Sequence, residues 1–351
     1  MCWYPGVTPI VGDKRQGPIT PLGCPWLGGR VLGGAGEVVG DSRDAEDHPS
    51  ALPLWERGCR RCPLHPSRLH PQHRLPHGQQ GWLPDPPGRH NRLRRLAGME
   101  GPGADSVLLT GCDGGLGLAL LKGLLEQPRP PRHLFAACLD PQGKAINEVA
   151  LGCPSVVVLP LDVTDPNSIK AAVGKVQEEV GSAGLNLLIN NASTMRHSTL
   201  ATETAENMTL VYTTNTIGPL QTSQAFLPLL KEAAEAKGQH GMSCSRAAIV
   251  NISSILGSIE VVEAWEERQD VCYRCSKAAL NMLTKCLALE YGGSGILCVS
   301  VDPGCVTPPL EWGTGPVTVE ESVRGILRLL AQLSATSNGT FWDWRGQSLP
   351  W

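Results

Sequence analysis

The chain has 351 residues, a formal net charge of −3 and 13 cysteines. The cysteines are odd in number and irregularly spaced, which argues against the disulfide framework of a secreted protein. The sequence contains no uninterrupted run of about 18 apolar residues, and its N-terminus lacks the charged start and apolar core of a secretory signal. We therefore predict a cytoplasmic protein without a membrane span.

The first 98 residues differ in composition from the rest of the chain. They hold 14 Pro and 15 Gly, a proportion typical of low-complexity unfolded sequence, and show no hydrophobic period. Their 13 Lys and Arg against 8 Asp and Glu give a net charge of +5, which leaves −8 for the remainder. This contrast predicts a disordered extension over 1–98 and a single folded domain over 99–351, with Met99 as a second candidate start of translation.

The extension carries one cluster with the spacing of zinc ligands. Cys59-x-x-Cys62 is followed by four histidines at positions 65, 70, 73 and 77. Four prolines interrupt this stretch, and they would break the helix that usually presents histidine ligands. Its arginines would suit an anionic surface or a nucleic acid, but a solvated tail explains them as well. We predict no metal site and no nucleic-acid partner.

From residue 106 onward, apolar runs of strand length alternate with longer helical patterns, which is typical of parallel βαβ units. The predicted strands are 106–110, 133–138, 155–160, 186–190, 247–253, 296–301 and 340–343. The predicted helices are 115–126, 166–179, 204–236, 272–291 and 318–333. Right-handed crossovers would wind these into an α/β fold, a doubly wound, parallel, seven-stranded sheet of Rossmann type with helices on both faces.

A glycine-rich turn, Thr110 to Gly117, follows the first predicted strand and opens the first predicted helix. Glycines in such a turn let the backbone approach a pyrophosphate, whose charge the amides and dipole of the helix N-terminus stabilise. Gly111, Gly115 and Gly117 give the spacing G-x-x-x-G-x-G rather than the commoner G-x-G-x-x-G. A glycine turn without a ligand is the alternative.

Tyr273 and Lys277 lie four positions apart on a predicted helix and can share one face. A phenol loses its proton near pH ~10 in water, and a neighbouring ammonium would stabilise the phenolate. Ser254 follows the fifth predicted strand, where its hydroxyl could donate to a substrate carbonyl. Ser253 is the competing serine, but strand alternation points one of the two away from the site.

These motifs, together with Asn190-Asn191-Ala192, resemble the short-chain dehydrogenase/reductase family. The resemblance runs from about Val107 to Trp351 and is strongest to the carbonyl-reductase branch that includes the C-factor and sniffer proteins. It implies a catalytic set in which Ser254 holds the substrate oxygen, Tyr273 is the general acid/base, Lys277 assists it and Asn215 takes part in a proton relay. A solvent-facing role is the alternative for Asn215.

The resemblance also implies contacts with a nicotinamide cofactor. Asp162 would cap the adenine amino group and Val163 would pack on the ring, although an acidic residue here also suits an N-cap, a role we expect for Asp165. The full implied set is Gly111, Asp113, Gly115, Leu116, Gly117, Asp162, Val163, Asn191, Ala192, Tyr273, Lys277, Pro303, Gly304 and Val306.

Two positions depart from the family pattern. Ser193 stands where the family has glycine, at a cost on the order of 1 kcal/mol if the backbone there requires positive φ. Pro308 occupies the place of the usual threonine. Only a short lid follows it, which predicts an open pocket for varied carbonyl compounds.

Cofactor choice is the point on which the resemblance and the local charges disagree. The branch implies NADP, but the expected basic residues are replaced by Asp113-Gly114 and Leu139-Asp140, which favour NAD. Three cations are near in sequence and could compensate: Lys122, Arg132 and Lys144. We expect NADP, with NAD as the alternative.

The predicted function is reduction of a small-molecule carbonyl to an alcohol, or the reverse, by hydride transfer with Tyr273 as general acid/base. The acidic segment 260–270 would line the substrate mouth. The alternative is a dinucleotide-binding protein with weakened catalysis and a signalling or scaffold role. The resemblance implies a homodimer or homotetramer, paired through 204–236 and 272–291.

Overall fold

The computed structural model describes residues 101–236, 241–262, 265–266, 268–305 and 317–351. The predictions for 1–98, including Cys59, Cys62 and the four histidines, lie outside these residues, as do Val306 and Pro308. Within the described part of the chain, no helix is both long and apolar enough to cross a membrane.

Seven parallel strands form one sheet in the order β3-β2-β1-β4-β5-β6-β7, which confirms the predicted fold class. The sheet runs outward in both directions from β1 and β4, so strand order reverses between these two. In such sheets ligands bind beyond the carboxyl ends at the reversal point. The strands are β1 (Ser106–Thr110), β2 (His133–Cys138), β3 (Val156–Pro160), β4 (Leu187–Asn190), β5 (Ala248–Ile252), β6 (Leu297–Asp302) and β7 (Thr340–Asp343).

The described helices are α2 (Gly115–Leu125), α3 (Lys144–Gly152), α4 (Pro166–Val180), α5 (Ala205–Tyr212), α6 (Gly218–Ala236), α7 (Val271–Tyr291) and α8 (Val319–Gln332). Helix α3 was not predicted, because it is only nine residues long and its apolar stripe is limited to Ile146, which is buried, and to the partly buried Val149 and Ala150. The predicted helix 204–236 is interrupted by a π-helical turn, Thr213–Ile217.

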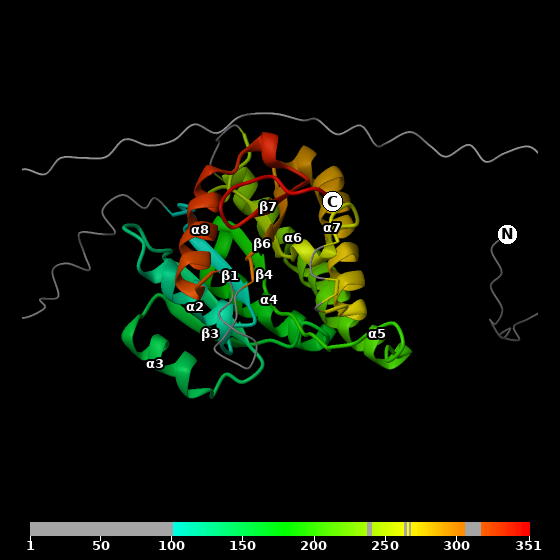
Figure 1. Cartoon of the computed structure of the whole chain (residues 1–351). Coiled ribbons are helices and arrows are strands. Elements are labelled where there is room, and N and C mark those ends of the chain that lie inside the picture. The colour runs from blue at the N-terminus through cyan, green and yellow to red at the C-terminus, as the bar shows by residue number, and fades with distance from the viewer. Residues whose placement is uncertain (1–100, 237–240, 263–264, 267, 306–316) are drawn as a thin grey trace, which may run out of the picture. The chain divides into compact units, whose positions relative to one another are not determined.

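Helices cover both faces of the sheet (Figure 1). Leu109 packs in a core with residues of α2 and α8, whereas its neighbour Leu108 packs in a second core with residues of α4, α6 and α7. Adjacent strand residues point to opposite faces, so every central strand contributes to both cores. Full burial of each such leucine stabilises the fold by roughly 1.5–3 kcal/mol.

Candidate active site

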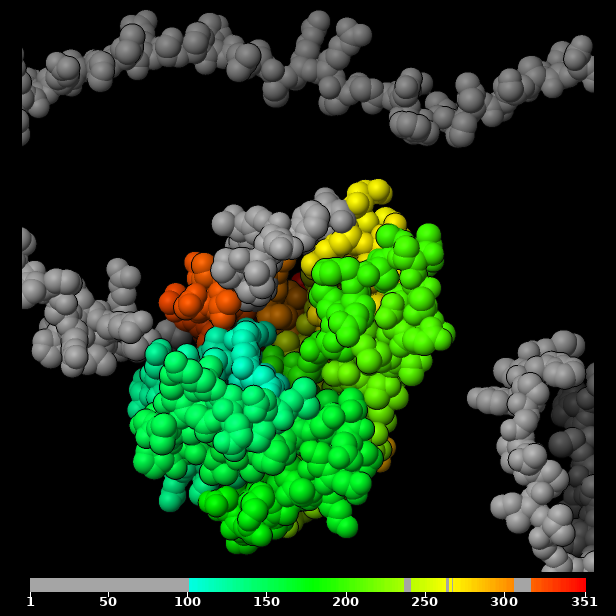
Figure 2. All heavy atoms as spheres, turned by 90° about the horizontal axis from the view of Figure 1, so that it is seen from below, coloured from blue at the N-terminus to red at the C-terminus, as the bar shows by residue number. Residues whose placement is uncertain are grey.

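A cavity of about 610 Å³ opens at the carboxyl ends of the strands, beside β1 and β4. Figure 2 views the molecule from below and shows a hollow between the cyan-to-teal and the green segments. Of the predicted cofactor residues, eight line the cavity: Gly111, Asp113, Leu116, Gly117, Asp162, Val163, Asn191 and Ala192. Its volume falls in the range of about 300–1,000 Å³ that is typical of small-molecule sites.

The glycine turn is built for close backbone approach. A Cβ on Gly117 would lie 2.0 Å from the carbonyl oxygen of Gly111, and Gly111 itself has a φ of 71°. Helix α2 begins directly after the turn, and its N-cap residue, Gly114, has no side chain to cap the first amides. These amides and the positive end of the helix dipole suit a phosphate group.

The segment after β4 braces this turn. The side-chain amide of Asn191 donates to the carbonyl oxygens of Thr110 and Gly111 at 2.9 and 3.1 Å. The backbone amides of Asn191 and Ala192 both donate to the Thr110 hydroxyl at 3.0 Å. The preceding residue, Asn190 at the end of β4, donates through its side chain to the Asn251 side chain at 2.8 Å and so links β4 to β5.

The two acidic residues after β3 have different partners. Asp165 caps α4 by accepting from the Asn167 amide at 2.9 Å, as predicted. The Asp162 side chain accepts instead from the amide and hydroxyl of Thr164 at 2.8 and 2.7 Å, and the residue lines the cavity. Because Asp165 caps α4, Asp162 is not needed as the helix cap and can contact a ligand in the cavity.

Asn215 lies in the π-helical turn and is fully buried. Its side-chain oxygen accepts from the Thr194 amide at 2.8 Å and from the Ser193 hydroxyl at 3.2 Å. Its side-chain nitrogen donates to the Thr194 carbonyl at 2.9 Å and to the Ser276 hydroxyl at 3.0 Å. Burial in this network is inconsistent with the solvent-facing alternative.

Ser193 does not carry the backbone strain that glycine would relieve. Among the described residues, Asp270 alone has a positive φ without being glycine. The free-energy cost that a positive φ would impose on Ser193 is therefore absent. The Ser193 hydroxyl instead donates a hydrogen bond to Asn215.

The structure brings Ser254, Tyr273 and Lys277 together. The Ser254 side chain is close enough to the Tyr273 side chain to lower its pKa by hydrogen bonding, and the Lys277 ammonium lies 5.4 Å from the Tyr273 ring centroid. Lys277 is buried and donates to the Ile252 carbonyl at 2.8 Å. Ser253 points elsewhere, since its hydroxyl donates to Asn281 at 2.6 Å.

Burial dominates the ionisation of this group. It raises the pKa of Tyr273 to about 12, with the Asp302 carboxylate acting in the same direction and the Ser254 hydrogen bond opposing it. Burial lowers the pKa of Lys277 to about 7, against the opposing effect of Asp302. Lys277 is not among the groups that act on the Tyr273 pKa, so the expected lowering by Lys277 is not seen, and the cost of burying a phenolate raises that pKa instead.

Sequence reasoning gave no role to Asp302, which the structure places at the centre of the site. One carboxylate oxygen accepts from the Ile255 amide at 3.0 Å, and the other accepts from the Gly304 amide at 3.1 Å. The residue therefore joins the loop after Ser254 to the Pro303-Gly304 turn. An acidic residue at the carboxyl end of a buried strand, β6, was the available signal.

Five of the predicted cofactor residues are not among the residues described as lining the cavity: Gly115, Tyr273, Lys277, Pro303 and Gly304. The Pro303-Gly304 turn is held by the Ser322 hydroxyl, which donates to the Pro303 carbonyl at 2.6 Å. Gly304 has a φ of 78°, and a Cβ there would lie 2.7 Å from the Trp344 ring. Backbone conformation and packing therefore both require glycine at this position.

Fold and site together define a Rossmann-type α/β protein with a largely buried Ser-Tyr-Lys group and a glycine-rich turn that opens the first helix after β1. A family model for short chain dehydrogenases matches residues 105–316. The chain belongs to the short-chain dehydrogenase family, as its motifs predicted.

Solved carbonyl reductases are similar to this chain. The NADPH-bound carbonyl reductase from chicken fatty liver is 47% identical, with a TM-score of 0.70 and coverage of 73% of this chain and 98% of that one. The carbonyl reductase Sniffer of D. melanogaster is 35% identical, with a TM-score of 0.67 and coverage of 71% and 100%. The predicted resemblance to the carbonyl-reductase branch is confirmed.

Among curated relatives, human 17-beta-hydroxysteroid dehydrogenase type 2 is 33% identical over 205 residues, which cover 57% of this chain and 46% of the relative. The chain thus spans about half the length of this relative, and the same holds for the mouse estradiol 17-beta-dehydrogenase 2.

Proposed function

We propose that the chain is an NAD(P)-dependent oxidoreductase that reduces a carbonyl to an alcohol, or catalyses the reverse reaction. The observation that carries this proposal is the joining of the buried Ser254 and Lys277 with the half-buried Tyr273 in one group at the carboxyl ends of the strands. Membership of the short-chain dehydrogenase family and the similarity to carbonyl reductases support it.

The hydride would come from the nicotinamide cofactor. The Ser254 hydroxyl would hold the substrate oxygen by hydrogen bonding as negative charge develops on it. Tyr273 would transfer its proton to that oxygen as general acid, or accept it in the reverse direction. Lys277 would stabilise the phenolate left on Tyr273, because an ammonium adjacent to a phenolate favours the charged form.

Asn215 would act on the site through Ser276, without touching the reacting atoms itself. Its side-chain nitrogen donates to the Ser276 hydroxyl, which donates in turn to the Tyr273 carbonyl at 2.8 Å. These two hydrogen bonds link the π-helical turn to the first turn of α7, where Tyr273 lies. The proton relay that the resemblance implies for Asn215 is part of this proposal.

The cofactor that we propose is NADP, which the chicken reductase is described as binding in its reduced form. The residues of the glycine turn fit a dinucleotide. The 2′-phosphate that distinguishes NADP from NAD is less well accommodated, because the turn after β2 carries Leu139 and the acidic Asp140 where a basic residue is expected. The Asp140 amide donates to the Asp113 side chain at 2.8 Å, which holds that carboxylate beside the turn.

Of the three cations that could compensate, placement favours Lys144. Arg132 precedes β2 and therefore lies at the opposite end of that strand from the cavity. Lys122 lies in the last turn of α2, about two turns from the phosphate-binding end. Lys144 begins α3 shortly after β2, where its largely exposed ammonium is 3.8 Å from Glu148. NAD remains the alternative cofactor.

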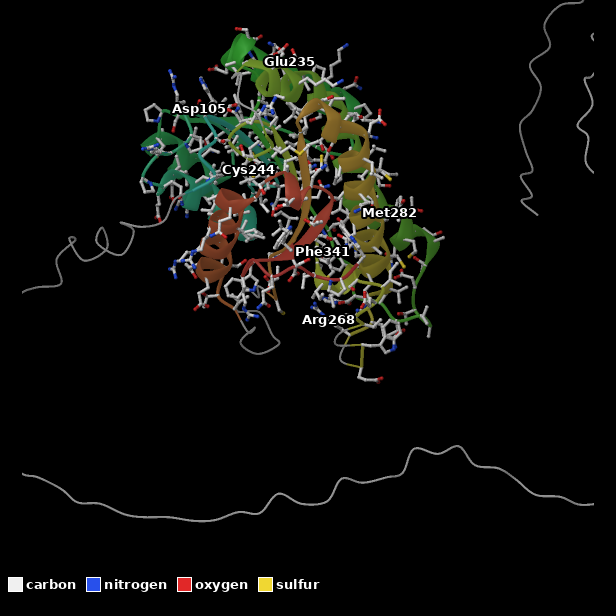
Figure 3. The ribbon with its side chains drawn as sticks, turned by 90° about the horizontal axis from the view of Figure 1, so that it is seen from above. Asp105, Glu235, Cys244, Arg268, Met282 and Phe341 are labelled. Atoms are coloured by element: carbon white, nitrogen blue, oxygen red, sulfur yellow. The ribbon has the colours of Figure 1, made fainter. Side chains whose placement is uncertain are left out.

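We further propose that two copies of the chain pair through α7, as the resemblance implies. Four residues of this helix form an exposed stripe at helical spacing: Cys275, Met282, Cys286 and Leu289. Met282 is 65% exposed and projects from the outer side of the helix (Figure 3). Sedimentation of the Met282→Glu, Leu289→Glu double variant tests this pairing, and unchanged sedimentation would contradict it.

The cytoplasmic location stays a prediction.

Titration of the protein with NADPH and with NADH, followed by a turnover assay on a panel of carbonyl compounds, tests the proposed function. Saturable binding with turnover is the expected result. Binding without turnover on any aldehyde or ketone would favour the scaffold alternative, and absence of binding would contradict both.

A further inference from the structure

The loop that follows Ser254 is hydrogen-bonded to Trp351. The main-chain oxygen of Trp351 accepts from the amides of Ile259 and Glu260, both at 3.0 Å, and from the Ser258 hydroxyl at 3.2 Å. The Ser258 hydroxyl also accepts from the Val261 amide at 3.1 Å. A single oxygen thus gathers three donors from the loop 258–260.

Trp351 is itself anchored to the sheet. Its ring stacks on the buried ring of Phe341 in β7, with centroids 5.6 Å apart and an interplanar angle of 17°. Phe341 lies in the red strand labelled in Figure 3. The Leu349 amide donates to the Phe341 carbonyl at 2.8 Å, and Trp342 forms an antiparallel bridge with Ser348. The segment 347–351 therefore runs back along β7 and is held beside it.

The opposite side of the loop packs on the catalytic helix. A Cβ on Gly257 would lie 2.6 Å from the main-chain carbon of Lys277, so the loop contacts α7 at the position of the catalytic lysine. The Ser254 hydroxyl accepts from the Leu256 amide at 3.2 Å. A shift of residues 258–260 would therefore be transmitted both to the Ser254 hydroxyl and to the surface around Lys277.

We propose that Trp351 is a positioning residue for the carbonyl substrate. Stacking on Phe341 holds its main-chain oxygen in place, and that oxygen fixes the loop 258–260, which in turn orients Ser254. This role rests on the proposed function, since it concerns the substrate side of the same site. Residues 258–260 and 351 are not among those that line the described nucleotide cavity, so we expect their effect to fall on substrate binding more than on binding of the nucleotide.

Three variants test this role: Trp351→Ala, which removes the stacked ring, Trp351→Phe, which keeps an aromatic ring, and Leu151→Ala as a control. Leu151 is 88% exposed on α3, far from β7 in sequence and on another element. We expect Trp351→Ala to raise KM for a carbonyl substrate roughly tenfold, with the Kd for NADPH unchanged within about twofold. Trp351→Phe should restore KM, and Leu151→Ala should match the parent.

Hydrogen exchange provides a readout that does not depend on turnover. The amides of Ile259 and Glu260 should exchange roughly tenfold faster in Trp351→Ala, while amides of β1 and β4 keep their protection. If Trp351→Ala speeds exchange but the parent shows no turnover, the contact of Trp351 with the loop 258–260 is supported and only the proposed function is contradicted. Unchanged exchange, unchanged KM, or an equal loss of NADPH affinity would each overturn the positioning role.

Discussion

The Lys277 ammonium lies 5.4 Å from the ring centroid of Tyr273, and both side chains come from the first two turns of α7. Lys277 is only 2% exposed, and its pKa of about 7 places it near the midpoint of its titration at neutral pH. A small change of pH therefore alters the charge beside the proposed catalytic phenol.

Replacement of Lys277 by Met should change how stability depends on pH. The pKa of Lys277 falls from 10.5 to about 7 on folding, so the unfolded chain binds more protons between these values. The cost of burying the ammonium is complete below pH 7 and is relieved as the pH rises to 10.5. The free energy of unfolding of the parent, relative to Lys277→Met, should rise by about 4 kcal/mol across this window.

Urea denaturation of both proteins at pH 6.5, 8 and 9.5 measures this difference. Subtraction of the variant removes the contributions of the other titrating groups, including the buried cysteines. A difference that is flat, or that falls with rising pH, would show that Lys277 is not buried as a neutral amine.

Ser253 and Ser254 form a matched pair, since they are adjacent and chemically identical but face different partners. Ser254→Ala should lower kcat by about 100-fold, because it removes a donor to the developing negative charge. Ser253→Ala should retain turnover but lose about 1 kcal/mol of stability with its bond to Asn281. Steady-state kinetics and thermal unfolding check the pair, and equal losses of turnover would refute the assignment.

Gly117→Ala should block the dinucleotide. The new Cβ would overlap the Gly111 carbonyl oxygen, so the turn must move away from the phosphate-binding position. We expect the Kd for NADPH to rise at least roughly tenfold in a fluorescence titration. The control is Gly174→Ala in α4, where a Cβ meets nothing within 4 Å and should stabilise the helix by about 1 kcal/mol. Equal affinity in both variants would place the dinucleotide elsewhere.

The sheet could be predicted from sequence because its strands are short apolar runs buried on both faces, as Leu108 and Leu109 illustrate. Helix α3 could not, since it has only nine residues and its apolar stripe is limited to Ile146, Val149 and Ala150. The two glycine-dependent turns, around Gly111 and Gly304, were also predictable, because close approach demands that residue type.

The remaining parts of the site depend on contacts between distant segments. The bond from Ser193 to Asn215 spans 22 positions, and the bond from Ser258 to Trp351 spans 93. No local period encodes such pairs. The sequence shows Ser193 only as a departure from the family's glycine, because its partner Asn215 lies in a distant π-helical turn. The role of Asp302 is not apparent from sequence, because its carboxylate accepts from two backbone amides and no side-chain motif marks them.

Turnover of Tyr273→Phe tests the central claim most directly, because the change removes one hydroxyl and keeps the ring. The hydroxyl is the proton donor in the proposed mechanism, so kcat for carbonyl reduction should fall by at least about 100-fold, while NADPH binds with a Kd within about twofold of the parent. A Tyr273→Phe protein that reduces the carbonyl at the parent rate would contradict the mechanism.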